Sequence, residues 1–158
     1  MAAVQVSPGQ QPVNRNCLTL RIIVQSGQKR DLPPQDTDQK PSREIWTFNN
    51  FLRECHGGAI AAGSHTGAGI GSMLVEDNVL NHSDMPFRFK SAPVNGGGIY
   101  DVLIRDCAVG DAQKVFTFNT TYSDANQAMT VEPADKPAEF YNIDAFRRHG
   151  RISVPAAT

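Results

Sequence analysis

The chain has 158 residues, which is long enough for one domain with a sizeable hydrophobic core. Its 15 basic and 16 acidic residues give a formal net charge of −1, and this balance argues against nucleic acid as a partner. No run of about 18 apolar residues is present, which argues against a membrane-spanning helix. The N-terminal sequence MAAVQVSPGQQPV has neither a basic start nor an apolar run, so it does not predict a secretion signal.

The N-terminal part of the chain combines polar segments with one short apolar stretch. Residues 1–14 are polar and rich in proline and glutamine, and we expect this segment to be disordered. The sequence CLTLRIIV of Cys17–Val24 is apolar and β-branched, which predicts a strand. Residues 25–44 contain three prolines, which interrupt regular structure, so we expect a loop there.

Residues 45–122 hold an internal repeat with a step of 28 and then 29 residues. Ile45–Gly63 aligns with Met73–Ser91, and that segment aligns with Val102–Thr120. Short apolar stretches with turn residues between them predict strands, and no helical pattern separates the copies. Strands at this spacing predict stacked coils, each unable to bury its apolar side alone. The sequence therefore predicts an all-β, right-handed parallel β-helix of about three to four coils.

The alignment of the repeats also predicts which side chains face the core. Two sets of equivalent positions are mostly aromatic: Ala59, Phe87 and Phe116, and then Ala61, Phe89 and Phe118. Because strand residues alternate between two faces, we expect both sets to point inward. The residues between them, including Ile60, Arg88 and Lys90, are then expected to point outward.

Asn50 and Asn78 occupy the same position of successive repeats, which predicts a ladder of stacked amides at a turn. Cys107 takes the next place in this column, and we expect a small buried thiol there.

The three cysteines and four histidines of the chain show no zinc-binding spacing. Gly96–Gly98 lacks the lysine and the helix that follow a phosphate-binding loop. We therefore expect neither a metal nor a cofactor.

The repeat pattern weakens toward the C-terminus. Residues 123–139 include two prolines and predict a loop, whereas Phe140–Ile143 is typical of the start of another coil. Coil ends without a cap predict end-to-end self-association. The expected organisation has three parts, namely a disordered segment (1–14), a partial β-helix domain (15–144, with the loop 25–44) and an irregular C-terminal tail (145–158).

Several segments form a recognisable combination: Phe48–Phe51 with His56 and Gly57, Gly63–Ala68, Ser83 and Asp84 before Arg88–Ser91, Gly96–Gly98, and Pro137–Tyr141. Together they resemble the polygalacturonase family of glycoside hydrolases, in particular its bacterial exo-acting poly-α-galacturonosidases. The resemblance covers about residues 45–144. It implies an all-β, right-handed parallel β-helix of the pectin-lyase-like fold, and hydrolysis of α-1,4-galacturonosyl links of pectin with inversion. The family is extracellular or periplasmic, although this chain shows no signal peptide.

The resemblance also implies roles for individual residues. His56 lies in Cys-His-Gly, where the family has Gly-His-Gly, and corresponds to a histidine that supports the catalytic carboxylates. Arg88 and Lys90 form the family's Arg-x-Lys motif, which binds the galacturonate carboxylate; a planar guanidinium can pair both oxygens. Tyr122 corresponds to a substrate-binding tyrosine one coil further on. Asp84 has two interpretations, a catalytic acid or a turn aspartate that bonds backbone amides, and we favour the second.

The catalytic aspartates of the family lie in two further motifs, Asn-Thr-Asp and Gly-Asp-Asp. The position of Gly-Asp-Asp corresponds here to Asn14–Asn16 (NRN), which has no carboxylate, and Asn-Thr-Asp would lie before it. An inverting glycosidase needs one carboxyl group to protonate the leaving oxygen and another to activate water, about 6.5–9.5 Å apart. We therefore expect a fragment or an inactive homologue.

Three alternatives stay open for the function. The first is hydrolysis, with carboxylates supplied from elsewhere, for example by Asp31, Asp36 or Asp38 of the long loop. The second is a non-catalytic module that binds polygalacturonate or another acidic oligosaccharide without cutting it. The third is a truncated product that has no function alone and aggregates through its uncovered ends.

Overall fold

The structure is a computed structural model that describes residues 2–4, 22–24, 40–122, 133–147 and 150–153. Its regular elements are strands in three sheets. The first sheet contains β1 (Ala2–Val4), β3 (Ile45–Phe48), β6 (Ile70–Glu76), β9 (Gly98–Arg105), β12 (Glu139–Arg147) and β13 (Gly150–Ser153), in that order. The second sheet has the order β10 (Ala108–Ala112), β7 (Val79–Ser83) and β4 (Phe51–Arg53). The third has the order β11 (Phe116–Asn119), β8 (Phe87–Lys90), β5 (Ile60–Ala62) and β2 (Ile22–Val24).

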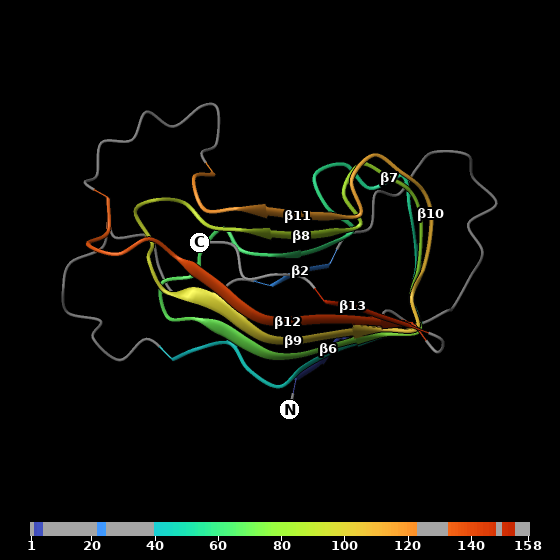
Figure 1. The fold of residues 1–158 in the computed structure, drawn as a ribbon, viewed down its shortest axis with the longest axis horizontal. Helices are drawn as coiled ribbons and strands as arrows, with labels where there is room; N and C mark the ends of the chain where they lie inside the picture. The colour runs from blue at the N-terminus through green and yellow to red at the C-terminus, as the bar shows by residue number, and fades with distance from the viewer. Residues whose placement is uncertain (1, 5–21, 25–39, 123–132, 148–149, 154–158) are drawn as a thin grey trace.

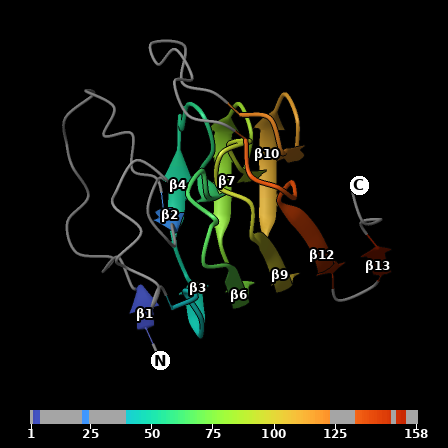
Figure 2. The same ribbon diagram turned by 90° about the vertical axis from the view of Figure 1, so that its left-hand side faces the viewer.

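Each coil gives one strand to each sheet. The complete coils are β3-β4-β5, β6-β7-β8 and β9-β10-β11, and β12 begins the next one. In Figure 1 the first and third sheets face each other and β7 and β10 of the second sheet close one side. In Figure 2 the coils follow one another along the stack. Within the coils all neighbouring strands pair in parallel, so the predicted all-β parallel β-helix is confirmed.

The repeat read from the sequence matches the strand register almost everywhere. Ile45 pairs with Met73 and Met73 with Val102, which reproduces the predicted steps in the first sheet. Phe87 pairs with Phe116 in the third sheet, again as predicted. A column of equivalent side chains therefore runs along the inside of each sheet, as expected where every unit buries its apolar side against its neighbours.

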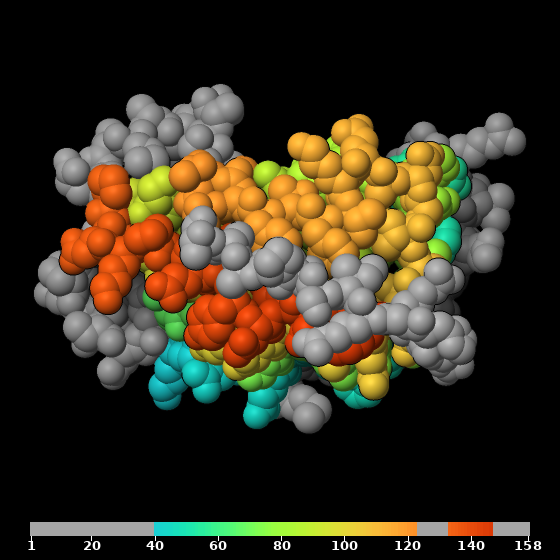
Figure 3. Space-filling model, viewed as in Figure 1, coloured from blue at the N-terminus to red at the C-terminus, as the bar shows by residue number. Residues whose placement is uncertain are grey.

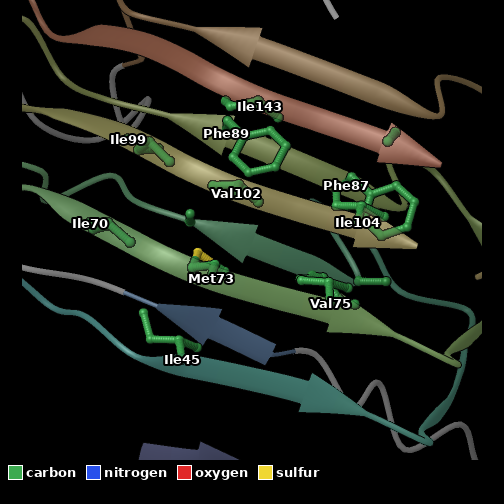
Figure 4. Close-up of a cluster of buried hydrophobic side chains, with 14 of the residues drawn as sticks. Ile45, Ile70, Met73, Val75, Phe87, Phe89, Ile99, Val102, Ile104 and Ile143 are labelled. Carbon is green, nitrogen blue, oxygen red and sulfur yellow. The ribbon is translucent and has the colours of Figure 1, made fainter. Parts of the chain in front are cut away.

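Inward-facing side chains from the sheets fill the centre of the coils (Figure 4). Phe87 stacks on Phe116 and Phe89 on Phe118, each with ring centroids 5.2 Å apart. Leu52 and Leu80 are fully buried on the second sheet. Burial of apolar side chains is the main stabilising contribution in such a stack, about 1.5–3 kcal/mol for each fully buried large side chain.

The phase of β5 differs from the prediction. Ile60, which we expected to point outward, pairs with Phe87 and lies in the core with 3% exposure. Ala61 instead shares the column of Arg88. The cause is the turn between the second and third sheets, which is one residue longer in this coil than in the next. A shift of one residue moves every side chain of a strand to the opposite face.

The amide ladder forms as predicted at the turn between the first and second sheets. Asn50 Nδ2 donates to Asn78 Oδ1 at 2.8 Å, and Asn78 Nδ2 donates to the carbonyl oxygens of Thr47 (3.0 Å) and Glu76 (2.8 Å). Asn78 is fully buried, so these bonds satisfy polar groups that water cannot reach. Cys107 continues the column, with its Sγ 3.9 Å from Asn78 Nδ2, but it is half-buried and not buried as expected.

The structure corrects two expectations about the ends of the chain. Residues 145–158 were expected to be an irregular tail, yet β12 continues through Arg147 and β13 pairs with it in antiparallel fashion. Residues 1–14 were expected to be disordered, yet Ala2–Val4 forms β1 and pairs with β3. β1 and β13, of three and four residues, carry too few alternating positions to stand out in a sequence. The rest of 1–14, the first part of the expected strand at Cys17–Val24, and residues 25–39 lie outside the described residues.

No helix in the described part of the chain is long and apolar enough to cross a membrane.

Candidate functional site

The outward face of the third sheet carries two cations side by side on β8. Phe87 and Phe89 are buried, so the alternating residues Arg88 and Lys90 point away from the core. Arg88 lies next to Thr117 of β11, and Lys90 lies next to Asn119. The two basic side chains therefore extend over the outer surface at the middle of the described stack.

Tyr122 lies against both cations. Its ring centroid is 5.1 Å from Arg88 Cζ and 4.0 Å from Lys90 Nζ. The backbone N–H of Tyr122 donates to the carbonyl oxygen of Ser91 at 2.9 Å, which ties the segment after β11 to the preceding coil. The negative face of an aromatic ring attracts cations, and this helps to keep two like charges close together. The structure thus brings together the three residues predicted to bind substrate.

His56 lies at the rim of this face and interacts with Asp84. His56 Nδ1 is 2.9 Å from Asp84 Oδ2, across one coil step of 28 residues. We had favoured a turn aspartate whose carboxylate bonds backbone amides. The contact observed for the Asp84 carboxylate is instead with the imidazole of His56. The repeat held a signal for this pair, because residues one step apart lie side by side in stacked coils.

The turn that carries His56 is joined to Arg88. Arg88 Nη1 donates to the carbonyl oxygen of Gly57 at 2.9 Å. Gly57 and Gly58 have φ values of 74° and 117°, which favour glycine, and a Cβ on Gly58 would lie 3.0 Å from Arg88 Cβ. The two glycines therefore allow the turn to pack closely against Arg88. The hydrogen bond to Gly57 then fixes the turn that carries His56 relative to Arg88.

Two polar atoms near the cations are buried without a hydrogen-bond partner among the described residues. They are Arg88 Nε and Thr117 Oγ1, which belong to paired residues of β8 and β11. Sequence reasoning did not select Thr117, because a threonine on the outward face of a strand is common. Unsatisfied buried polar groups are rare in proteins and often mark places where a ligand or water completes the bonding.

The arrangement is suited to an anion rather than to a metal ion. Arg88 and Lys90 supply positive charge and N–H donors, and both are fixed against Tyr122. Asp84 is a carboxylate beside these groups, and it contacts His56. The described residues contain no group of three or more histidine, cysteine, aspartate or glutamate side chains that could hold a metal.

Comparison with known proteins shows what the chain is similar to. No model of a protein family matches the chain. Over 106 residues, or 66% of its length, the chain is 43% identical to the exo-poly-α-D-galacturonosidase of Dickeya chrysanthemi. The family 28 exopolygalacturonase of Yersinia enterocolitica superposes on 80% of the chain with a TM-score of 0.61 and 34% identity. The chain spans only 17% of the first relative and 21% of the second.

Proposed function

Because the chain belongs, as a partial chain, to the polygalacturonase family of glycoside hydrolases, we propose that it binds the carboxylates of polygalacturonate without hydrolysing the polymer. The observation that carries this proposal is the group of Arg88, Lys90 and Tyr122 on the outer face of the third sheet. A preorganised pair of half-buried cations on this outer face favours a ligand that carries carboxylates.

The chemistry of the ligand fits these side chains. Galacturonate residues carry a carboxylate that a guanidinium can bind through two parallel hydrogen bonds, while an ammonium adds a point charge. The names of both relatives refer to galacturonate polymers.

The proposal excludes hydrolysis on chemical grounds. Inversion requires two carboxyl groups on opposite sides of the scissile bond, and each acid–base group typically contributes about 10²–10⁴-fold to the rate. Asp84 is a carboxylate at this site, and its Oδ2 is engaged with His56. The sequence NRN at Asn14–Asn16, outside the described residues, supplies no replacement.

Isothermal titration of the chain with trigalacturonate tests the binding proposal. We expect binding that weakens as salt is added, because exposed charges are screened. Arg88→Ala should weaken it about 10- to 100-fold, the value of a hydrogen bond to a charged group. Arg53→Ala is the matched control, since Arg53 is exposed on β4 of the second sheet and pairs with Glu54. Equal binding by wild type and Arg88→Ala, or no binding by wild type, would contradict the proposal.

A further inference from the structure

We infer that Asp84 is a positioning residue that fixes His56 as a hydrogen-bond acceptor for a sugar hydroxyl. This inference rests on the function proposed above and gives His56 a role that does not need catalytic aspartates. The observation behind it is the 2.9 Å contact between His56 Nδ1 and Asp84 Oδ2.

The contact selects one tautomer of the neutral imidazole. An ionised carboxylate can only accept hydrogen bonds, so the ring nitrogen beside it must carry the proton. His56 Nδ1 is therefore the donor and Nε2 keeps its lone pair. The side chain of His56 is 81% exposed, which leaves the imidazole open to a ligand. No described residue donates a hydrogen bond to Nε2.

The backbone holds the pair firmly in place. The N–H of Asp84 donates to the carbonyl oxygen of Cys55 at 3.3 Å, and the N–H of Lys114 donates to the carbonyl oxygen of Asp84 at 3.0 Å. These bonds tie three successive coils together at this position. They involve no side-chain atom of Asp84, so Asp84→Ala removes the carboxylate and leaves them intact.

The pair is also connected to the cation site. Gly57 directly follows His56, and its carbonyl oxygen accepts the hydrogen bond from Arg88 Nη1. A galacturonate whose carboxylate binds Arg88 would thus lie beside the turn that carries His56. The hydroxyl groups of such a sugar are donors, and an imidazole with an open Nε2 lone pair is a suitable acceptor.

The chain offers a matched control in a second histidine–aspartate pair. His82 Nδ1 lies 2.5 Å from Asp111 Oδ2, also across neighbouring coils. His82 and Asp111 belong to β7 and β10 of the second sheet, whereas Arg88 and Lys90 lie on the third. Asp111→Ala therefore removes the same kind of contact away from the proposed binding face.

The first readout is the tautomer, which needs no ligand. Long-range ¹H–¹⁵N spectra of the neutral imidazoles should show His56 protonated on Nδ1 in the wild type. In Asp84→Ala, His56 should shift toward the Nε2-protonated form that predominates in free histidine, while His82 stays unchanged. In Asp111→Ala, His82 should shift toward the Nε2-protonated form, while His56 stays protonated on Nδ1. An Nε2-protonated His56 in the wild type, or a spectrum that Asp84→Ala leaves unaltered, overturns the inference.

The second readout is the affinity for trigalacturonate. Asp84→Ala and His56→Ala should each weaken binding about two- to tenfold, the range for a net hydrogen bond, and the double variant should bind no worse than His56→Ala. Asp111→Ala should bind as the wild type does. Binding that depends on Arg88 but ignores Asp84 overturns this inference alone. Absence of wild-type binding overturns the proposed function and the ligand role of Nε2, while the tautomer spectra still decide the positioning by Asp84.

Discussion

A single buried carboxylate connects three coils on the outside of the first sheet. Glu76 is 8% exposed, and its Oε1 accepts a hydrogen bond from Trp46 Nε1 at 2.7 Å. Its Oε2 accepts from Arg105 Nε at 2.6 Å. Trp46, Glu76 and Arg105 lie on β3, β6 and β9. The carboxylate therefore has partners on the coils before and after its own, as a buried charge requires.

Replacing this carboxylate should lower the stability of the whole stack. We expect Glu76→Gln to reduce the free energy of unfolding by about 1.5–3 kcal/mol, because a hydrogen bond to a charged group is lost. Glu54→Gln removes the carboxylate of an exposed ion pair with Arg53 and should change it by less than about 1 kcal/mol. Urea unfolding followed by circular dichroism gives both values. Equal effects of the two changes would contradict this prediction, because they would mean that burial of Glu76 does not increase its contribution to the free energy of unfolding.

The thiol at the end of the amide ladder should make stability depend on pH. Burial raises the pKa of Cys107 above its ordinary value of 9.0. The folded state therefore keeps this proton at a pH where the unfolded chain releases it, so the stabilisation is present below about pH 9 and is lost as pH rises through the folded pKa. In urea titrations from neutral to alkaline pH, wild type should lose more stability than Cys107→Ser above that point. Parallel curves would contradict this prediction.

At the scale of elements, the turn after β5 is packed directly against β8. Gly63 has a φ of 99°, and a Cβ at this position would lie 1.7 Å from the carbonyl oxygen of Lys90. No rotation of a side chain can relieve a clash with backbone. The close approach of these two segments therefore requires glycine, and it sets the position of Lys90 on the proposed binding face.

Gly63→Ala should disturb both folding and binding. We expect a loss of about 2 kcal/mol or more in unfolding free energy, from the clash and from strain at positive φ, together with weaker trigalacturonate binding. Gly110→Ala is the control, because its new Cβ would meet only the side-chain oxygen of Asn81, at 2.9 Å. That variant should stay within about 0.5 kcal/mol of wild type. If both variants unfold at the same urea concentration, the turn is not held against Lys90.

The elements also show what sequence patterns can and cannot predict. The steps of 28 and 29 residues predicted the registers of the first and second sheets, since stacked coils must align equivalent side chains. They failed at Ile60, because an alignment at a constant step cannot show that one turn of the coil contains an additional residue. The grouping of Arg88, Lys90 and Tyr122 was predicted from the resemblance. The contact of Asp84 with His56 was missed, because turn aspartates usually bond to nearby backbone.

At the scale of the whole molecule, the stack ends in strands with unpaired edges among the described residues. β10 and β11 are the last described strands of the second and third sheets. Figure 3 views the molecule along the direction in which the coils stack, and side chains of this last coil form much of the surface seen there. Val115, in the turn between these two strands, is 41% exposed. Unpaired strand edges are templates for pairing with another chain, so we expect copies of this chain to associate end to end.

Sedimentation velocity over a range of concentrations tests this association. The apparent mass of the wild type should rise with concentration, and Val115→Lys should weaken the rise by placing a charge at the end of the stack. Val79→Lys is the control, because Val79 is equally exposed (40%) but lies on β7, in the middle of the second sheet. A constant mass for the wild type, or equal effects of the two lysines, would rule out association through this end.

The proposal that this β-helix binds galacturonate without cutting it is tested most directly by following reducing ends. The folded chain would be incubated with polygalacturonate, beside Arg88→Ala and a buffer control. We predict no release above the buffer control, even under conditions where titration shows binding. Steady release that Arg88→Ala abolishes would contradict the proposal, and would mean that carboxylates from another segment, such as Asp31, Asp36 or Asp38, complete a working site.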